Sequence, residues 1–289
     1  MTSIDDLRPH LLDNFQRQLL DASARGLLDE DNPLRLNHFS ASFRELVRHV
    51  FDKLAPDVDV KLCSWFVPDP TSQTGVTRGH RASYVLHGGL SLDYATHTLG
   101  VDVEGERKAL VKAVDKLSKF THVNPSTFGL PSDEVTRYVD SACEALRDLL
   151  VSAQMARETL GSSLEAQIHN QVVMAAISET ILSVDEIATH HSVDEVYVDQ
   201  VKVIRVGSAF VEFMAVGSVG VELQWGSNSD VGRGDGAVGS ESFPMTCQLE
   251  SSVDDPENVS AVEDTLCVDT SSWYGEDDWQ DDRREPPQL

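Results

Sequence analysis

The sequence lacks the long apolar stretches that membrane proteins need. No apolar run reaches the roughly 18 residues required to cross a bilayer. The first residues, MTSIDDLRPH, have neither the basic start nor the apolar core of a secretory signal peptide. We therefore expect a cytoplasmic protein that does not bind membranes.

Cysteine is scarce, and its spacing excludes the common cysteine-based sites. The cysteines are Cys63, Cys143, Cys247 and Cys267, and no two of them form a C-x-x-C pair. Zinc knuckles and redox dithiols require such pairs, so neither is indicated. We expect buried free thiols at these positions.

Basic residues are also in short supply. The 289 residues include 23 Lys and Arg against 48 Asp and Glu, which leaves a formal net charge of −25. This balance argues against a protein that coats nucleic acid through a broad basic face. An enzyme can still act on nucleic acid through a local basic cluster.

Much of the negative charge lies after Ser251, where Arg283 and Arg284 are the only basic residues. Such a segment cannot bury enough apolar surface to offset the entropy lost on ordering. We therefore expect residues 253–289 to form a disordered acidic tail. Its tryptophans, Trp273 and Trp279, also resemble a short motif for a basic groove, so the tail either keeps the protein soluble or binds a protein partner.

Helical periodicity dominates the first two thirds of the chain. The clearest helix begins near Pro33 and ends before Pro56, with apolar residues three and four positions apart. Further helices are expected over Leu7–Leu28 and from about Glu106, Ser132 and Leu164. The intervening residues 57–105 are rich in Pro, Gly, Ser and Thr and indicate a long irregular loop. The pattern predicts a helical domain over residues 1–183 with an irregular insertion at about 57–105.

The period changes to two from Val196 onward, which is typical of half-buried strands. Two such strands flank a glycine-rich loop, and their inward residues are Val219, Val221, Leu223 and Trp225 in the first and Phe243, Met245, Cys247 and Leu249 in the second. We expect a small antiparallel β domain at residues 194–252. The predicted fold class is α+β, with an all-helical N-terminal domain, this β domain and the acidic tail.

At three places in the sequence, a basic residue precedes a histidine at a spacing found in one class of metal-free ribonuclease. That class uses an arginine and a histidine on one helix for proton transfer beside a cation that stabilises the transition state. The pairs are Arg44 with His49, Arg81 with His87, and Lys116 with His122. We select Arg44 and His49 as catalytic candidates. The alternative for that pair is a solvated helix face, and for His122 a helix cap.

The order of these helices resembles the HEPN group of helical domains found in prokaryotic toxins and phage-defence proteins. The resemblance rests on ASFRELVRHVFDKLAPD, LSKFTHV and PSDEV and covers about residues 1–160. The arginine of that group is followed by a polar residue before the histidine. Arg44-Glu45 meets this pattern only in part, and Arg81-Ala82 does not meet it.

The segment VELQWGSNSDVGRGDGA followed by SFPMTCQLE resembles a C-terminal domain of predicted nucleases associated with prokaryotic PIWI-module conflict systems, over about residues 185–265. This resemblance implies a role in defence against phage or plasmids. Metal-dependent nucleases hold Mg²⁺ or Mn²⁺ with carboxylates near the scissile phosphate. The candidate ligands here are Glu222, Asp230 and Asp235, and the candidate catalytic residues include Glu222 and Asp230.

The alternatives for this loop are ordinary surface and turn chemistry. Glu222 and Gln224 are also consistent with outward residues of a strand, and Asp235-Gly236 with a turn. Gln224 stands where restriction-type nucleases commonly have lysine. No Walker motif follows the glycines, so nucleotide binding by that route is not expected.

Two functions remain open from the sequence. The first is a nuclease of a prokaryotic conflict system that acts on RNA or DNA. The second is a non-catalytic sensor or adaptor of a defence system, which forms a homodimer through its helical domain and binds a protein partner through its β domain or tail. The nuclease hypothesis predicts that Glu222 and Asp230, or Arg44 and His49, meet in one cleft.

Overall fold

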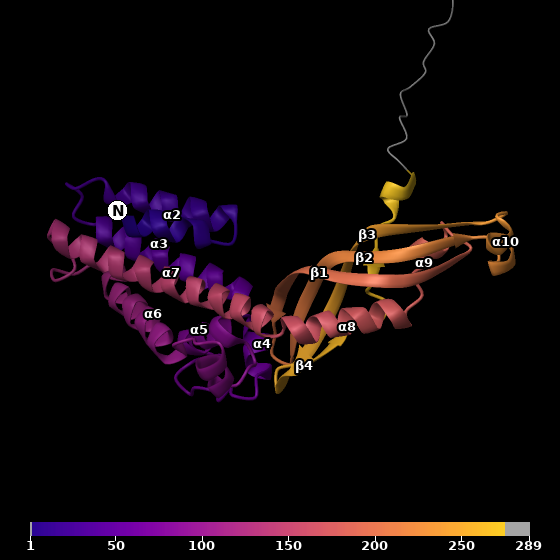
Figure 1. Ribbon diagram of the computed structural model, residues 1–289. Coiled ribbons are helices and arrows are strands. Elements are labelled where there is room, and N and C mark those ends of the chain that lie inside the picture. The colour runs from indigo at the N-terminus through magenta and orange to yellow at the C-terminus, as the bar shows by residue number, and fades with distance from the viewer. Residues whose placement is uncertain (1, 275–289) are drawn as a thin grey trace, which may run out of the picture. The chain divides into compact units, whose positions relative to one another are not determined.

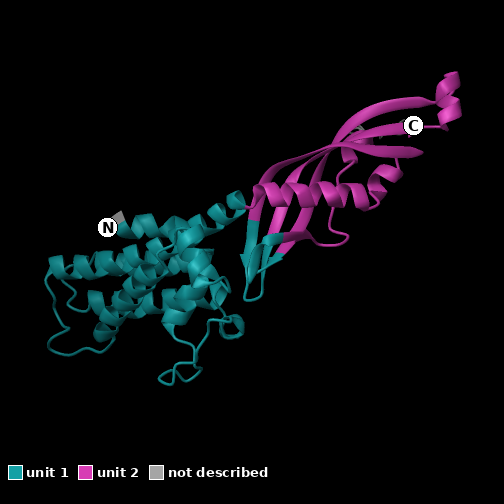
Figure 2. Cartoon of the chain, turned by 60° about the horizontal axis from the view of Figure 1, so that its bottom comes forward, with its two compact units in different colours: residues 1–163, 203–212, 251–258 teal, residues 164–202, 213–250, 259–289 magenta. Residues whose placement is uncertain are grey.

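The computed structural model describes residues 2–274, and its contacts divide the chain into two compact units (Figures 1 and 2). Unit 1 contains residues 1–163, 203–212 and 251–258, and unit 2 contains residues 164–202, 213–250 and 259–289. The α+β fold class is confirmed, because a helical N-terminal region precedes an antiparallel sheet. Within the described residues no helix has the length and apolar character needed to cross a membrane.

Unit 1 consists mainly of helices that pack their apolar sides together. Its helical elements are α1 (Thr2–Leu7), η1 (Arg8–His10), α2 (Asn14–Leu27), α3 (Arg35–Leu54), α4 (Asp57–Leu62), α5 (Arg78–His87), η2 (Tyr94–Thr98), α6 (Val103–Ser118), η3 (Lys119–Thr121) and α7 (Ser132–Ser163). Helix α3 lies where the sequence predicts it and buries Phe39, Phe43 and Val50. It packs against α2, α5, α6 and α7, which makes it the centre of the unit.

Two predictions for unit 1 need correction. The helix expected over Leu7–Leu28 is interrupted, because the Asp13 side chain accepts a hydrogen bond from the Gln16 backbone and caps α2 as a separate helix. The segment 57–105 is also more regular than expected. It contains α4, α5 and η2, and α5 begins at a capping box in which the Thr77 hydroxyl and the His80 ring each bind the other's backbone N–H.

Unit 2 is a five-stranded sheet with helices attached. Its elements are α8 (Glu165–Ser178), α9 (Leu182–Asp185), β1 (His190–Val206), β2 (Phe210–Trp225), α10 (Asn228–Arg233), β3 (Ala237–Ser252), β4 (Asp255–Ala261), β5 (Cys267–Val268) and η4 (Ser271–Tyr274). The strands follow the order β1-β2-β3-β4, and β5 pairs antiparallel with β3. The ends of β1 to β4 at residues 203–212 and 251–258 are counted with unit 1.

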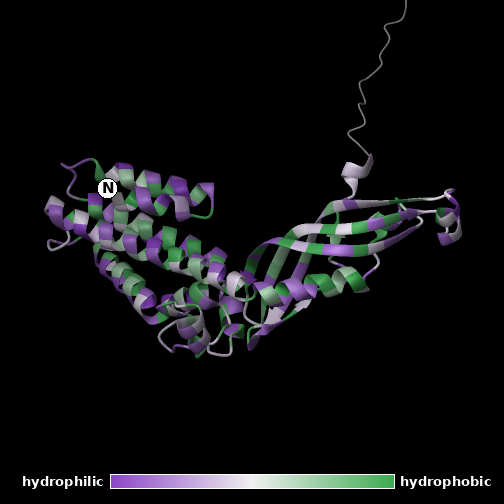
Figure 3. Ribbon diagram, viewed as in Figure 1, coloured by the Kyte–Doolittle hydropathy of each residue, from purple (hydrophilic) through white to green (hydrophobic). Residues whose placement is uncertain are grey.

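The predicted inward faces of β2 and β3 are largely correct. Val219, Val221 and Leu223 on β2 are buried, and so are Phe243, Met245, Cys247 and Leu249 on β3. Trp225 is only partly buried. Figure 3 shows the resulting alternation of hydrophobic and hydrophilic residues along the strands, and Figure 2 shows α8 lying along the sheet.

The boundary of the helical region differs from the predicted one. Residues 164–183 were expected in the helical domain, but α8 and α9 are grouped with the sheet. Helix α7 ends at Ser163, at the Gly-Ser-Ser sequence that breaks its pattern. Helix α8 buries Ile168 and Val172, so its apolar side belongs to the core of unit 2.

Part of the segment predicted as a disordered acidic tail is ordered. Residues 253–274 are ordered through β4, β5 and η4, because Val259 and Val268 are buried and Trp273 stacks on Trp225 with ring centroids 5.5 Å apart. These few apolar contacts offset the acidic composition. The remaining tail residues 275–289, with Trp279, lie outside the described residues.

Candidate functional site

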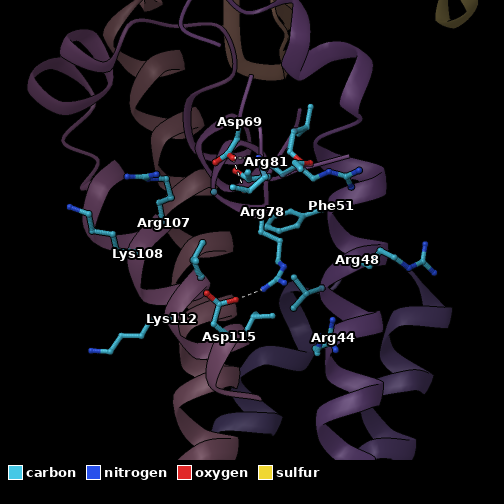
Figure 4. A pocket seen from close by; sticks show the side chains of 18 of the residues that line it. Arg44, Arg48, Phe51, Asp69, Arg78, Arg81, Arg107, Lys108, Lys112 and Asp115 are labelled. Atoms are coloured by element: carbon cyan, nitrogen blue, oxygen red, sulfur yellow. Dashed lines mark hydrogen bonds and ion pairs between the residues drawn. The ribbon is translucent and has the colours of Figure 1, made fainter. Parts of the chain in front are cut away.

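A groove with a volume of about 1180 Å³ lies in unit 1, between α3, α5, α6 and the loop that precedes α5 (Figure 4). Its basic lining residues are Arg44 and Arg48 of α3, Arg78 and Arg81 of α5, Arg107, Lys108, Lys112 and Lys116 of α6, and Lys119 of η3. Its acidic lining residues are Glu45, Asp52, Asp69 and Asp115. Nine of the 23 basic residues of the chain therefore line one groove, with a formal excess of five positive charges.

Helix geometry places these cations in rows. Lys108, Lys112 and Lys116 follow at four-residue intervals on α6, so each lies about 6 Å further along the helix axis than the one before. The opposite side of α6 buries Leu110 and Leu117. Figure 4 shows Arg44 and Arg48 along one side of the groove and Arg107, Lys108 and Lys112 along the other.

Four groove arginines are held by carboxylates, and one of them is Arg107, which binds Glu104 of the same helix at 2.7 Å. Arg78 binds Asp115 across the α5–α6 contact, with a nitrogen to oxygen distance of 2.8 Å. The Asp52 carboxylate forms ion pairs with both Arg48 and Arg81, with nitrogen to oxygen distances of 2.8 and 2.7 Å. These pairs orient the guanidinium groups and neutralise part of the positive charge.

Four other groove cations make no ion pair with any residue in the 2–274 range. They are Arg44, Lys112, Lys116 and Lys119. The three lysines are exposed, and Arg44 is half-buried. Because these charges are not compensated locally, they supply most of the positive potential available to a bound anion.

The structure separates the predicted pair Arg44 and His49. Arg44 lines the groove, whereas the His49 ring packs edge-on against Phe15 of α2, with ring centroids 4.9 Å apart. Five residues along a helix correspond to a rotation of about 140°, which explains the divergence. The two side chains therefore lie on different sides of α3.

In the other two predicted pairs, the basic residue also lines the groove and the histidine does not. Arg81 lines the groove, but His87 is 4 % exposed, and its Nδ1 donates to the Leu90 carbonyl at 2.8 Å. Burial lowers the pKa of His87. Lys116 lines the groove, whereas His122 follows η3 and is not among the lining residues.

In the glycine-rich loop, Asp230 is engaged in a helix cap. Its carboxylate accepts hydrogen bonds from the Ser227 backbone N–H at 2.9 Å, from the Ser227 hydroxyl at 2.6 Å and from the Arg233 side chain at 2.6 Å. The hydrogen bonds from Ser227 and then that from Arg233 hold the pKa of Asp230 below its usual range. Asp235 lies 3.6 Å from the same Arg233. The loop is therefore a capped turn around α10.

Glu222 projects from the exposed side of β2, and no hydrogen bond or ion pair joins it to Asp230 or Asp235 within the described residues. The Gln224 amide nitrogen donates to the Gly226 carbonyl at 2.9 Å, which is a local contact. In the part of the chain that the structure describes, no three His, Cys, Asp or Glu side chains gather closely enough to hold a metal ion. The three predicted metal ligands are thus not brought together.

The groove itself could not be foreseen from the sequence, apart from the general expectation of a local basic cluster. Its signal was present in the four-residue spacing of Lys108, Lys112 and Lys116 and of Arg44 and Arg48. Each spacing alone describes an ordinary solvated helix face. Only the packing of α3 against α6 turns two such faces into one site.

Comparison with protein families gives a consistent result for both parts of the chain. Residues 8–146, which include the whole groove, match one family model, and residues 153–274 match a second. Both models are described as predicted pPIWI-associating nuclease. No curated protein and no solved structure matches the chain. The chain belongs to the predicted pPIWI-associating nucleases.

Proposed function

We propose that this protein binds RNA or DNA in the α3–α5–α6 groove and acts as a nuclease of a prokaryotic conflict system directed against phage or plasmids. The observation that carries the proposal is the concentration of nine basic side chains in one groove of a chain whose net charge is −25. A polyanion that fills the groove releases its counterions, which drives association. The acidic remainder of the chain disfavours binding elsewhere.

Cleavage is supported by the description of the family, and binding by the geometry of the groove. The groove positions phosphates but has no histidine among its lining residues. A nucleic-acid-binding adaptor is the second candidate, because the predicted catalytic residues Glu222, Asp230, Arg44 and His49 are not brought into one cleft. An adaptor would bind nucleic acid and leave cleavage to a partner protein.

The binding test compares two double variants with the same change of charge. Lys112→Glu/Lys116→Glu alters the groove, whereas Lys61→Glu/Lys202→Glu alters exposed lysines outside it. Fluorescence anisotropy with labelled single-stranded RNA and double-stranded DNA, in EDTA, measures affinity without cleavage. We expect the groove variant to bind roughly tenfold more weakly or worse and the control to bind like the wild type. Equal losses in both variants would refute the groove as the binding site.

The cleavage test uses the same substrates with Mg²⁺ or Mn²⁺ and again with EDTA. Metal-dependent cleavage that Glu222→Ala or Asp230→Ala abolishes would support the loop carboxylates as metal ligands. Cleavage that survives EDTA and fails in His49→Ala would assign the reaction to the helical unit. Binding without cleavage under any condition would favour the adaptor.

A further inference from the structure

We propose that the groove recognises the sugar–phosphate backbone of one nucleic-acid strand and does not read its bases, with Asp115 acting as an internal competitor for that backbone. This inference rests on the proposed function, because it names what part of the nucleic acid the groove contacts. It follows from the chemistry of the lining residues, from their spacing and from the Arg78–Asp115 ion pair.

The described residues that line the groove include no exposed aromatic ring on which a base could stack. Proteins that hold single strands through their bases present exposed aromatic rings. Phe51 is the only aromatic residue among those lining the groove, and it is 1 % exposed. It forms part of the apolar floor, so bases gain no stacking partner there.

The groove also has few free side chains of the types that read base edges. Base edges are read mainly by bidentate Asn, Gln or Arg side chains. The lining residues include no Asn or Gln. Among the lining arginines, Arg44 alone makes no ion pair within the described residues, because the other four pair with carboxylates. The other lining cations are lysines, whose ammonium groups bind phosphates as point charges.

The spacing of the lysines suits a repeating anion. Lys108, Lys112 and Lys116 form a row with about 6 Å of axial rise at each step. Helices α3 and α6 contact each other, and side chains from both helices line the groove. One row of lysines on one wall of the groove matches one phosphate backbone, with the bases directed toward solvent.

Asp115 opposes this binding from inside the groove. It is 60 % exposed and holds Arg78, which is 40 % exposed, at 2.8 Å. A phosphate that approaches Arg78 must displace this carboxylate or bind beside it. Removing the Asp115 charge therefore frees one cation for the backbone and removes one repulsive charge, and both changes favour binding.

The test measures the affinity of the full-length protein for labelled oligo(dA), oligo(dT), oligo(rU) and a mixed-sequence strand of equal length, over a salt series in EDTA. We expect the four affinities to agree within about threefold at each salt concentration. We expect Asp115→Asn to bind all four several-fold more tightly, with the slope of log K against log salt steeper by about one. The matched control is Asp21→Asn, which frees Arg8 outside the groove.

The outcomes separate this inference from the proposed function. A preference of tenfold or more for one base composition, with binding still dependent on Lys112 and Lys116, would overturn backbone recognition and leave the proposed function intact. Binding of double-stranded DNA but of no single strand would overturn the inference alone, and failure to bind any of these nucleic acids would overturn both. An Asp115→Asn affinity no higher than that of Asp21→Asn would overturn the role of Asp115. Equal affinities together with a gain specific to Asp115→Asn would support the inference.

Discussion

Arg81 of α5 binds Asp57 at the start of α4, and two of its nitrogens lie 3.0 and 2.7 Å from the same carboxylate oxygen. The side chains are only 21 % and 24 % exposed. Because Arg81 also binds Asp52 of α3, a single guanidinium links three helices at the edge of the groove. This linkage holds α3, α4 and α5 together beside the groove.

The Arg81–Asp57 pair should matter for stability. Asp57→Asn leaves the partly shielded guanidinium with a weaker partner, and we expect a loss of about 1–2 kcal/mol in the free energy of unfolding. Urea unfolding followed by circular dichroism measures it. The control is Asp93→Asn, whose pair with His97 is almost fully exposed and should contribute nothing measurable. Equal effects of the two substitutions would contradict the structural role of Arg81.

Substitution by alanine should change the stability of the protein in opposite directions at two glycines. A Cβ at Gly89 would lie 2.3 Å from the Ser208 carbonyl oxygen, and the Gly89 N–H donates to the Gly207 carbonyl at 2.8 Å. We expect Gly89→Ala to cost about 1–3 kcal/mol through overpacking. Gly26 lies in α2, and a Cβ added there would meet no atom within 4 Å, so Gly26→Ala should stabilise the helix by about 0.5–1 kcal/mol. Thermal unfolding measures the melting temperature of both variants. A Gly89→Ala protein as stable as the wild type would contradict the close packing of residues 207–208 on Gly89.

The buried His87 should make stability depend on pH. Burial lowers its pKa in the folded protein below the ordinary value of 6.5, so the unfolded chain binds a proton more readily. Its contribution is fully present above pH 6.5 and is lost as the pH falls from there through the folded pKa. We expect the melting temperature to drop between pH 7.5 and 5.5, and His87→Gln to weaken this dependence. The exposed His97, changed to Gln, is the control. An unchanged pH dependence in His87→Gln would contradict the buried neutral imidazole.

The cap around α10 predicts a measurable effect on Asp230. Ser227→Ala removes the hydroxyl that donates to this carboxylate, so the pKa of Asp230 should rise toward its ordinary value of 3.8. A carboxyl carbon NMR titration follows this residue directly. In the wild type, the stabilisation from the cap is present above pH 3.8 and is lost as the pH falls through the lower folded pKa. A pKa unaffected by Ser227→Ala would contradict the cap.

The elements that the sequence predicted well are those set by local pattern. Helix α3 and the inward residues of β2 and β3 follow from apolar spacing alone, because each element buries one face. The ordered residues 253–274 were missed because their acidic composition conceals Val259 and Val268, whose burial depends on partners far away in the sequence. Pairings such as that of Cys267 with Thr246 are not visible in local composition.

The candidate site was harder to predict for the same reason. Spacing placed Arg44 and His49 on one helix but did not show that Phe15 of α2 covers His49 while Arg44 lines the groove. The groove depends on contacts between segments separated by up to 75 residues in the chain, from Arg44 to Lys119. A sequence with net charge −25 carries no general sign of a basic surface.

The most direct test of nucleic-acid binding in the groove is lysine footprinting by mass spectrometry. The protein is acetylated briefly with and without a saturating single-stranded oligonucleotide, in EDTA, and the modification of each lysine is compared. We predict that the oligonucleotide protects Lys112, Lys116 and Lys119 and leaves Lys61 and Lys202 as reactive as before. Protection of Lys61 and Lys202 with no protection of the groove lysines would contradict the account.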